Sequence, residues 1–190
     1  MIPSIESRRL SLRSMSVRVL ETLLADDRAG AGHVLECNIL DDLPLDEMPL
    51  ARRLEQIRRD PSEQPWLLRA IVERVSATMV GHFNFHTPPR PAYLATIAPD
   101  AVELGYSIHK PYRRKGYATE AALAMMHWAY AEHGQRGFFL SISPQNLPST
   151  NMAHALGFTQ CGSHIDDEDG LEIEYVRRFD EWPADWRAKE

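Results

Sequence analysis

A basic loop that contains glycine is the stretch of this sequence whose residue types point most clearly to chemistry. It lies between a strand-like segment and an amphipathic helix, and it reads Tyr112-Arg113-Arg114-Lys115-Gly116-Tyr117-Ala118-Thr119-Glu120. The first N–H groups of a helix lack partners, and the helix dipole places partial positive charge there. Gly116 and Ala118 let the backbone approach a phosphate closely, and three basic side chains add charge. The loop therefore predicts a pyrophosphate site.

A second interpretation makes this loop a solvent-exposed basic turn in which Thr119 caps the helix. Neither the GxxxxGK(S/T) pattern of nucleoside-triphosphate sites nor the GxGxxG pattern of dinucleotide sites occurs in the sequence. Both of those ligand classes are therefore disfavoured.

The loop and the strand before it resemble the GCN5-related N-acetyltransferase (GNAT) family. The pattern Arg113-x-x-Gly116-x-Ala118 is similar to the family's (R/Q)-x-x-G-x-(G/A) signature, which binds the pyrophosphate of acetyl-CoA. Residues 103–106 (ELGY) are similar to the family's E-(L/I)-G-Y strand. The two motifs occur in the family's order, so each supports the other.

Two further segments resemble the RimJ/RimL-like branch of that family, which is named for ribosomal-protein acetyltransferases. Residues 144–149 (PQNLPS) and 156–158 (LGF) are similar to its P-x-N-x-x-S and L-G-F motifs, and residues 6–13 are similar to its opening. The resemblance covers nearly the whole chain and is most specific from residue 103 to residue 158.

The resemblance implies that acetyl-CoA binds as a co-substrate and that no metal takes part. In the family, the pantetheine arm enters the sheet between two splayed strands and pairs with the backbone of one of them. An asparagine at the start of the next helix bonds the same arm, although Asn146 is equally well an ordinary N-cap. The residues implied for the cofactor are Tyr106, Ser107, Ile108, Arg113, Arg114, Lys115, Gly116, Tyr117, Ala118, Thr119 and Asn146.

The family's chemistry is direct attack of a neutral amine on the thioester in a ternary complex, so the leaving thiolate needs a proton or a hydrogen bond. Many members place a tyrosine seven residues after the asparagine, but this sequence has Ala153 there. The RimJ/RimL-like pattern offers Ser149 as the donor instead. The alternative for Ser149 is a helix serine that bonds the backbone four residues earlier.

Glu103 is the candidate general base, acting directly or through water, because it lies on the polar face of the strand that would receive the cofactor. We expect burial to raise its pKa, which suits a proton acceptor. The alternative is a structural carboxylate paired with an arginine. His82, His86 and His154 are further candidates, although isolated histidines more often satisfy local structure.

The elements that position these residues follow from hydrophobic periodicity. Strands are expected at residues 10–12, 66–75, 78–85, 102–108, 138–143, 158–163 and 171–179. Helices are expected at residues 16–37, interrupted at Gly30 and Gly32, at residues 50–59, and in the segments that end at Gly134 and Gly157. This order predicts a mixed sheet covered by helices. The resemblance makes it an α/β (mixed α+β) GNAT-type sheet, mostly antiparallel and splayed between strands 4 and 5.

Composition and charge narrow the class of protein. The 190 residues suit one domain, residues 1–190, and the net charge of −6 argues against a nucleic-acid binder. Cys37 and Cys161 show no metal-ligand spacing, and a disulfide framework is not expected, which suits the cytoplasm. The sequence shows no signal-peptide pattern and no apolar run long enough to span a membrane.

The charged segments bear on the acceptor. Acidic residues at 41–42 and 46–47 and at 166–169 motivate the hypothesis that a negative field draws a cationic acceptor; the alternative is solvated surface. Arg52, Arg53, Arg58 and Arg59 form a basic cluster that we interpret as a solvated helix face, with an RNA contact as the alternative.

These observations predict an acetyl-CoA-dependent N-acetyltransferase that modifies a primary amine, on a protein N-terminus or a small molecule. The alternative is a CoA-binding GNAT-fold sensor or accessory protein with little catalysis, which Ala153 keeps open. A nucleic-acid-binding module is disfavoured by the charge. The identity of the acceptor and the oligomeric state, homodimer included, are left open.

Overall fold

A computed structural model describes residues 2–167, 170–184 and 186, and there eight strands form one sheet in the order β1-β2-β3-β4-β5-β6-β8-β7. The strands are β1 (Ile5–Glu6), β2 (Leu10–Ser14), β3 (Arg69–Glu73), β4 (Thr78–Phe85), β5 (Ala101–Ile108), β6 (Gly137–Ile142), β7 (Thr159–Asp166) and β8 (Gly170–Arg178). The helices are α1 (Val17–Leu24), α2 (Arg28–Leu35), α3 (Leu50–Arg59), α4 (Tyr117–His133) and α5 (Leu147–Ala155), with short 3-10 turns η1 (Pro61–Trp66), η2 (Ala92–Leu94) and η3 (Lys110–Tyr112).

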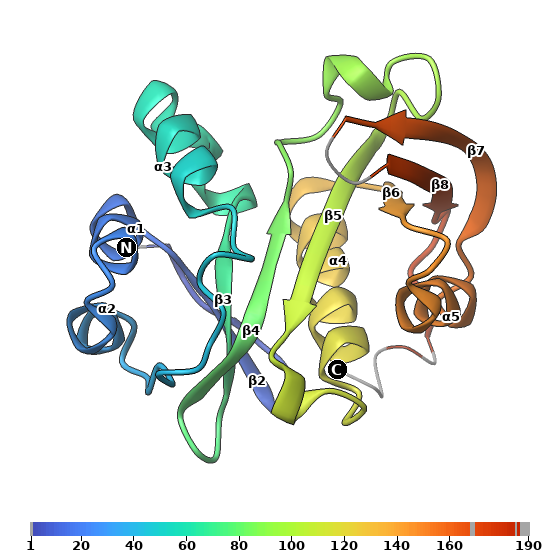
Figure 1. Ribbon diagram of the computed structural model, residues 1–190. Coiled ribbons are helices and arrows are strands. Elements are labelled where there is room, and N and C mark those ends of the chain that lie inside the picture. The colour runs from blue at the N-terminus through green and yellow to red at the C-terminus, as the bar shows by residue number, and fades with distance from the viewer. Residues whose placement is uncertain (1, 168–169, 185, 187–190) are drawn as a thin grey trace.

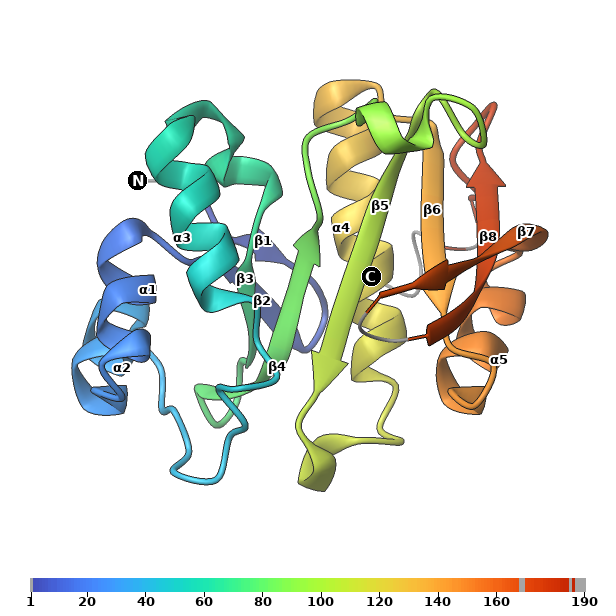
Figure 2. The ribbon, with the colours of Figure 1, turned by 45° about the horizontal axis from the view of Figure 1, so that its top comes forward.

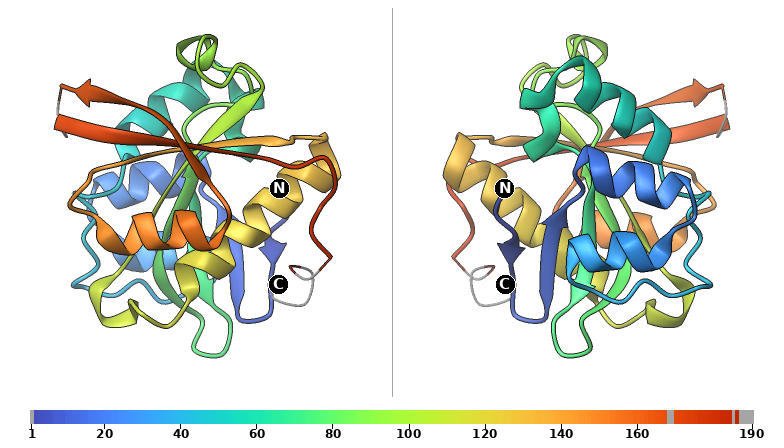
Figure 3. Two further views of the ribbon diagram at one scale, coloured as in Figure 1. Left: turned by 90° about the vertical axis from the view of Figure 1, so that its right-hand side faces the viewer. Right: turned by 90° about the vertical axis from the view of Figure 1, so that its left-hand side faces the viewer.

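Helices cover both faces of this sheet (Figure 1). Figure 3 shows α4 and α5 from one side of the molecule and α1 and α2 from the other. Each side has its own apolar core: one cluster joins β2, β4 and β5 to α4, and a second joins α1, α2 and α3 to β3. The alternation along β5 follows from this arrangement, because Val102 and Leu104 pack toward α4 while Glu103 lies on the opposite face.

The sheet splays between β5 and β6. These strands run parallel and pair only from Ala101 to Glu103 against Gly137 to Phe139. Among the residues that the structure describes, the rest of β5 therefore has no partner strand on that side. Figure 2 shows the two strands close together at one end and apart at the other. Every other strand pair is antiparallel, counted over the residues that the structure describes. The predicted mixed, mostly antiparallel sheet is confirmed, and its fourth and fifth expected strands are β5 and β6 because the short β1 precedes them.

The break in the first helical segment was predicted at the wrong residues. Gly30 and Gly32 lie inside α2, and the interruption falls at residues 25–27 instead. Asp26 adopts the left-handed backbone conformation, with φ of 55°, and the Asp27 carboxylate accepts from the Gly30 N–H at 2.8 Å. The Asp27 cap therefore starts a new helix at Arg28, two residues before Gly30.

Two strand starts also differ from the prediction. Trp66 closes the 3-10 turn η1, so β3 begins only at Arg69, and Phe158 precedes β7. Both aromatic side chains are buried in the core that contains α4, so their packing explains the apolar pattern without a strand. In the part of the chain that the structure describes, no helix is long and apolar enough to cross a membrane.

Candidate functional site

The basic loop leads into α4 through two left-handed residues. Arg114 has φ of 62° and Gly116 has φ of 81°. Gly116 occupies the N-cap position, and no side chain of the described residues caps the helix. Thr119 lies inside α4, so the interpretation of Thr119 as the cap is wrong. The opening N–H groups of α4 are therefore available to an anion, and the helix dipole adds partial positive charge beside them.

The loop is fastened to the N-terminal segment by Arg9, a contact that the sequence analysis did not predict. The Arg9 guanidinium donates to the Lys115 carbonyl at 2.9 Å and lies 4.7 Å from the centre of the Tyr117 ring. Its Nε also bonds the buried Glu120 carboxylate at 2.6 Å, and Ser7 donates to the same carboxylate at 2.8 Å. The resemblance of residues 6–13 to the opening of the RimJ/RimL-like branch is the sequence feature that could have indicated a role for Arg9.

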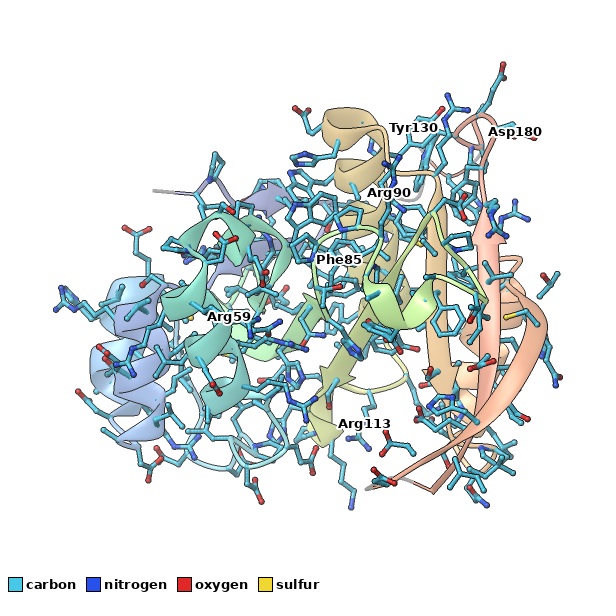
Figure 4. The ribbon with its side chains drawn as sticks, turned by 90° about the horizontal axis from the view of Figure 1, so that it is seen from above. Arg59, Phe85, Arg90, Arg113, Tyr130 and Asp180 are labelled. Atoms are coloured by element: carbon cyan, nitrogen blue, oxygen red, sulfur yellow. The ribbon has the colours of Figure 1, made fainter. Side chains whose placement is uncertain are left out.

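A cavity of about 610 Å³ adjoins this loop and holds most of the residues implied for the cofactor. Its lining includes Tyr106, Ser107, Ile108, Arg113, Arg114, Gly116, Tyr117, Ala118, Thr119, Asn146 and Ser149. Lys115 is the exception among the implied set: it does not line the cavity, and its ammonium lies over the Tyr112 ring at 4.9 Å. Arg113, labelled in Figure 4, donates through Nε to the Ile108 carbonyl and so ties the loop to the end of β5.

A second cavity of about 340 Å³ lies in the splay between β5 and β6. Tyr106, Asn146 and Ser149 line both cavities, so the two are contiguous. Asn146 caps α5 by accepting from the Ser149 N–H at 3.3 Å. Within the described residues, the hydroxyl that bonds the backbone four residues earlier is that of Thr150, which donates to the Asn146 carbonyl, whereas Ser149 lines the junction of the two cavities.

The hydroxyl of Tyr106 was not predicted as a functional group. It is buried and has no hydrogen-bond partner within the described residues. Burial raises the pKa of Tyr106, and the neighbouring Ser149 hydroxyl opposes that rise. Ala153, at the family's usual tyrosine position, is fully buried in the core. Tyr106 therefore places a protonated phenol at the junction of the two cavities, where Ala153 supplies none.

Glu103 is buried, but its pKa is lowered rather than raised, so that expectation was wrong. Burial on its own raises the pKa of Glu103. Hydrogen bonds and charge from His86, with further bonds from Tyr93 and Ser141, outweigh it. The Tyr93 hydroxyl lies 2.8 Å and His86 Nδ1 lies 3.1 Å from Glu103 Oε2. The carboxylate is thus ionised and engaged, with a histidine and a tyrosine in place of the arginine partner considered above.

Of the three histidine candidates, only His86 is placed beside Glu103. A Cβ atom built on Gly105 would lie 2.7 Å from His86 Nε2, so the imidazole lies against Gly105, which lines the splay cavity. His82 is buried, and burial lowers its pKa to about 4. His154 is exposed on α5 and packs edge-on against Tyr175.

A third cavity, of about 380 Å³, lies on the other side of His86 and Glu103, against α3. It is lined by Arg52, Arg53, Glu55, Gln56, Arg59, His86, Thr87, Tyr93 and Glu103. Arg53 is only 3% exposed, so the interpretation of the whole arginine cluster as a solvated helix face is wrong for this residue. Arg53 falls on the apolar stripe of α3, in line with Leu50, Leu54 and Ile57.

Within the part of the chain that the structure describes, the acidic segments do not line the three cavities. Asp41, Asp42, Asp46 and Glu47 are exposed and none of them borders the three cavities above; Asp42 lies 3.2 Å from His109 Nε2. Of the second segment, Glu168 and Asp169 lie outside the described residues. Within the described ranges, no group of three or more His, Cys, Asp or Glu side chains could hold a metal ion.

Acetyl-CoA fits the residues that are present. The uncapped start of α4, with Arg113 and Arg114 beside it, suits a pyrophosphate. The unpaired part of β5 offers backbone groups to an extended amide chain that runs toward the splay cavity. The reactive end of such a chain would lie near Tyr106, Ser149 and His86.

Comparisons with known proteins agree with this geometry. Residues 9–159 match the family described as "Acetyltransferase (GNAT) domain". The uncharacterised N-acetyltransferase YnaD of Bacillus subtilis is 24% identical over 92 residues, which span 48% of this chain and 49% of that protein, so the chain matches about half the length of this curated relative.

Solved structures share the fold at low sequence identity. A Bordetella pertussis protein described as a GnaT-family acetyltransferase has a TM-score of 0.64 and 20% identity, covering 92% of this chain and 98% of that chain. A structure of RimL, a ribosomal L7/L12 alpha-N-protein acetyltransferase, in complex with coenzyme A has a TM-score of 0.62 and 17% identity, covering 93% and 98%. The neighbours thus include the branch that the motifs resemble. With its signature loop, splayed sheet and domain-wide match, the chain belongs to the GNAT acetyltransferase family.

Proposed function

We propose that this protein is an acetyl-CoA-dependent N-acetyltransferase that transfers an acetyl group to a primary amine by direct attack in a ternary complex. The observation that carries the proposal is the continuity of the site. The loop cavity and the splay cavity share Tyr106. The third cavity is lined by His86 and Glu103, and the His86 ring lies against Gly105, which lines the splay cavity. The cofactor and the acceptor can therefore approach the contact between Gly105 and His86 from two different cavities.

The residues of the loop and of β5 bind and orient the cofactor in this proposal. N–H groups from Arg114 to Thr119 hold the pyrophosphate, and Asn146 and the free edge of β5 hold the pantetheine arm. When bound, acetyl-CoA supplies an activated thioester. The role of the chain is then to fix that thioester's position and to move protons around it.

The proton of the attacking ammonium is taken by His86 Nε2 in this proposal. Glu103 fixes the imidazole through Nδ1, which keeps Nε2 free to accept, so Glu103 acts as a positioning residue rather than as the base itself. This arrangement suits the lowered pKa of Glu103, because a carboxylate that is already stabilised as an anion accepts a proton poorly. The hydroxyls of Tyr106 and Ser149, which line the splay cavity, donate to the departing sulfur.

The experiment that tests the proposal measures release of CoA thiol from acetyl-CoA across a panel of primary amines, namely peptides with free N-termini, polyamines and aminoglycosides. Acceptor-dependent release, with N-acetylated product identified by mass spectrometry, is the expected result. Tight CoA binding by calorimetry without acceptor-dependent release would favour the sensor or accessory role instead.

The charged regions make opposite predictions about the acceptor. The acidic segments motivate a cationic amine, whereas the cavity beside His86 is bordered by three arginines. In either case the amine must lie near His86. The two predictions differ in the charge that the rest of the acceptor carries.

A further inference from the structure

Arg53 carries a buried positive charge without an ion-pair partner. Its side chain is 3% exposed, and its guanidinium donates only to neutral acceptors, the Gln56 amide oxygen and the His86 carbonyl. Its Nε is buried and makes no hydrogen bond, and no carboxylate of the described residues lies within 4.0 Å of it. A buried charge of this kind is unfavourable unless an anion compensates it.

Burial is the main reason that the pKa of Arg53 falls to about 10, and the neighbouring Arg52 lowers it further. Tyr93, Glu103 and Glu63 act in the opposite direction but do not offset the fall. Glu103 is already engaged by His86 and Tyr93, so it is not free to neutralise the guanidinium.

Arg69 is a second buried arginine in the same protein, and its terminal nitrogens are more fully bonded than those of Arg53, although its Nε also lacks a partner within the described residues. Its guanidinium donates to three backbone carbonyls, those of Pro3, Leu12 and Pro65, and it lies 5.4 Å from the centre of the Trp128 ring. Arg53 bonds a single carbonyl and borders an open cavity instead. The difference indicates a position that is completed by something outside the chain.

The cavity beside Arg53 has an excess of positive charge. Arg52 and Arg59 border it from exposed positions on α3, a helix seen from above in Figure 4, where Arg59 is labelled. The carboxylates on its lining are Glu55, which is exposed, and the engaged Glu103. Three guanidiniums, one of them buried, make a site that suits a carboxylate or a phosphate.

His86 connects this arginine cluster to the reaction point. Its carbonyl accepts from Arg53 at 2.9 Å and from Gln56 at 3.1 Å, while its ring reaches Gly105 in the splay. A group held by Arg53 and an amine held at His86 Nε2 would thus both lie against the same residue, His86, so we expect the two groups to be close together in the acceptor.

We propose that the acceptor carries an anionic group, a carboxylate or a phosphate, next to its primary amine, and that Arg53, Arg52 and Arg59 bind this group. The inference rests on the proposed function, because it treats the cavity against α3 as the acceptor subsite. It replaces the cationic acceptor motivated by the acidic segments, none of whose described residues at 41–47 borders this cavity.

Four C-terminally amidated tripeptides with free N-termini test the proposal: Ala-Glu-Ala, Ala-Gln-Ala, Ala-Lys-Ala and Ala-phosphoserine-Ala. The expected KM is about tenfold lower for the anionic peptides than for the lysine peptide, with the glutamine peptide between them. The glutamate and phosphoserine peptides distinguish the two anionic groups. The preference weakens as salt screens the exposed arginines.

Matched variants assign the preference to the cavity. The double variant Arg52→Gln/Arg59→Gln changes exposed positions, and we expect it to reduce the difference between peptides to about twofold. Arg58→Gln is the control, because Arg58 lies on the same helix but pairs with Glu21 outside the cavity. Arg53→Gln tests the buried charge itself. The melting temperature of this variant is measured as well, because the Arg53 side chain also bonds the His86 carbonyl and its loss can destabilise the fold.

A binding measurement separates failure of this inference from failure of the proposed function. N-acetyl-Ala-Glu-Ala-amide is titrated into the protein by calorimetry, and we expect binding that the arginine double variant abolishes and Arg58→Gln retains. Turnover of all peptides with no anionic preference, or with a lysine preference, would overturn the inference and leave the function standing. Absence of turnover with anion binding intact would overturn the function alone, and absence of both would overturn both.

Discussion

Three hydrogen bonds converge on Glu103 and reverse the effect that burial alone has on its pKa. His86, Tyr93 and Ser141 all stabilise the anion, so the carboxylate orients its neighbours instead of titrating near neutral pH. The reaction then needs another base, and the His86 ring lies between the splay and the arginine-lined cavity. The separate roles of Glu103 and His86 can be measured.

A double-mutant cycle on His86 and Glu103 distinguishes the base from its positioning partner. We expect His86→Ala to lower kcat by about a hundredfold and Glu103→Gln by about tenfold, because only the imidazole accepts the proton. Glu103→Gln should then add little in the His86→Ala background. A larger loss from Glu103→Gln than from His86→Ala, retained in the double variant, would instead identify Glu103 as the base. Melting temperatures of all variants serve as the folding control.

His82 predicts an acid sensitivity of the fold. Burial, with the positive charge of Arg53, lowers its pKa from 6.5 to about 4 in the folded chain. Between these values the unfolded chain binds more protons, so the free energy of unfolding falls as the pH falls from 6.5 to 4, by about 3 kcal/mol at most from this group. Urea unfolding at several pH values checks the slope, and His82→Gln should flatten it. An equal slope in the variant would show that His82 does not contribute.

At the scale of elements, the sequence predicts what depends on local pattern. The bounds expected for β4, residues 78–85, are those observed, and the basic loop lies between β5 and α4 as expected. What depends on distant contacts was missed. Arg53 was interpreted as surface because its neighbours in sequence are basic, although its position three residues after Leu50 puts it on the buried stripe of α3. The junction of Tyr106 with His86 and the arginines needed the tertiary structure.

The N-terminal segment supports the cofactor loop from a distance in sequence, and this support can be tested. Arg9 joins the Lys115 carbonyl to Glu120 in the first turn of α4. We expect Arg9→Met to weaken CoA binding by about fivefold, because the loop loses a hydrogen bond that holds its shape. It should also lower the free energy of unfolding by about 2 kcal/mol, because the Glu120 carboxylate is left buried without its cation.

Calorimetry with CoA and chemical unfolding measure the two effects of Arg9→Met. Arg8→Met is the matched control, since the neighbouring arginine is exposed and makes none of these contacts. Equal CoA affinities for the two variants would show that Arg9 stabilises the fold without shaping the loop.

Across the whole molecule, charge is separated rather than spread evenly. The net charge is −6, yet both regions assigned to ligands are basic: the loop at residues 113–115 and the cavity against α3. The net field therefore repels two anionic ligands that the local sites attract. In this view the exposed acidic residues at 41–42 and 46–47 slow the encounter of those ligands and do not recruit the acceptor.

The triple variant Asp41→Asn/Asp46→Asn/Glu47→Gln tests this view and spares Asp42, which contacts His109. Removing three negative charges should lower KM for acetyl-CoA about two- to threefold at low salt, and the effect should vanish near 0.5 M salt, where the screening length is only a few ångströms. The KM of the anionic peptide should fall in parallel, because both ligands approach the same field. If the segment instead recruits a cationic acceptor, the KM of the lysine peptide must rise steeply at low salt, and that outcome would count against the anionic acceptor.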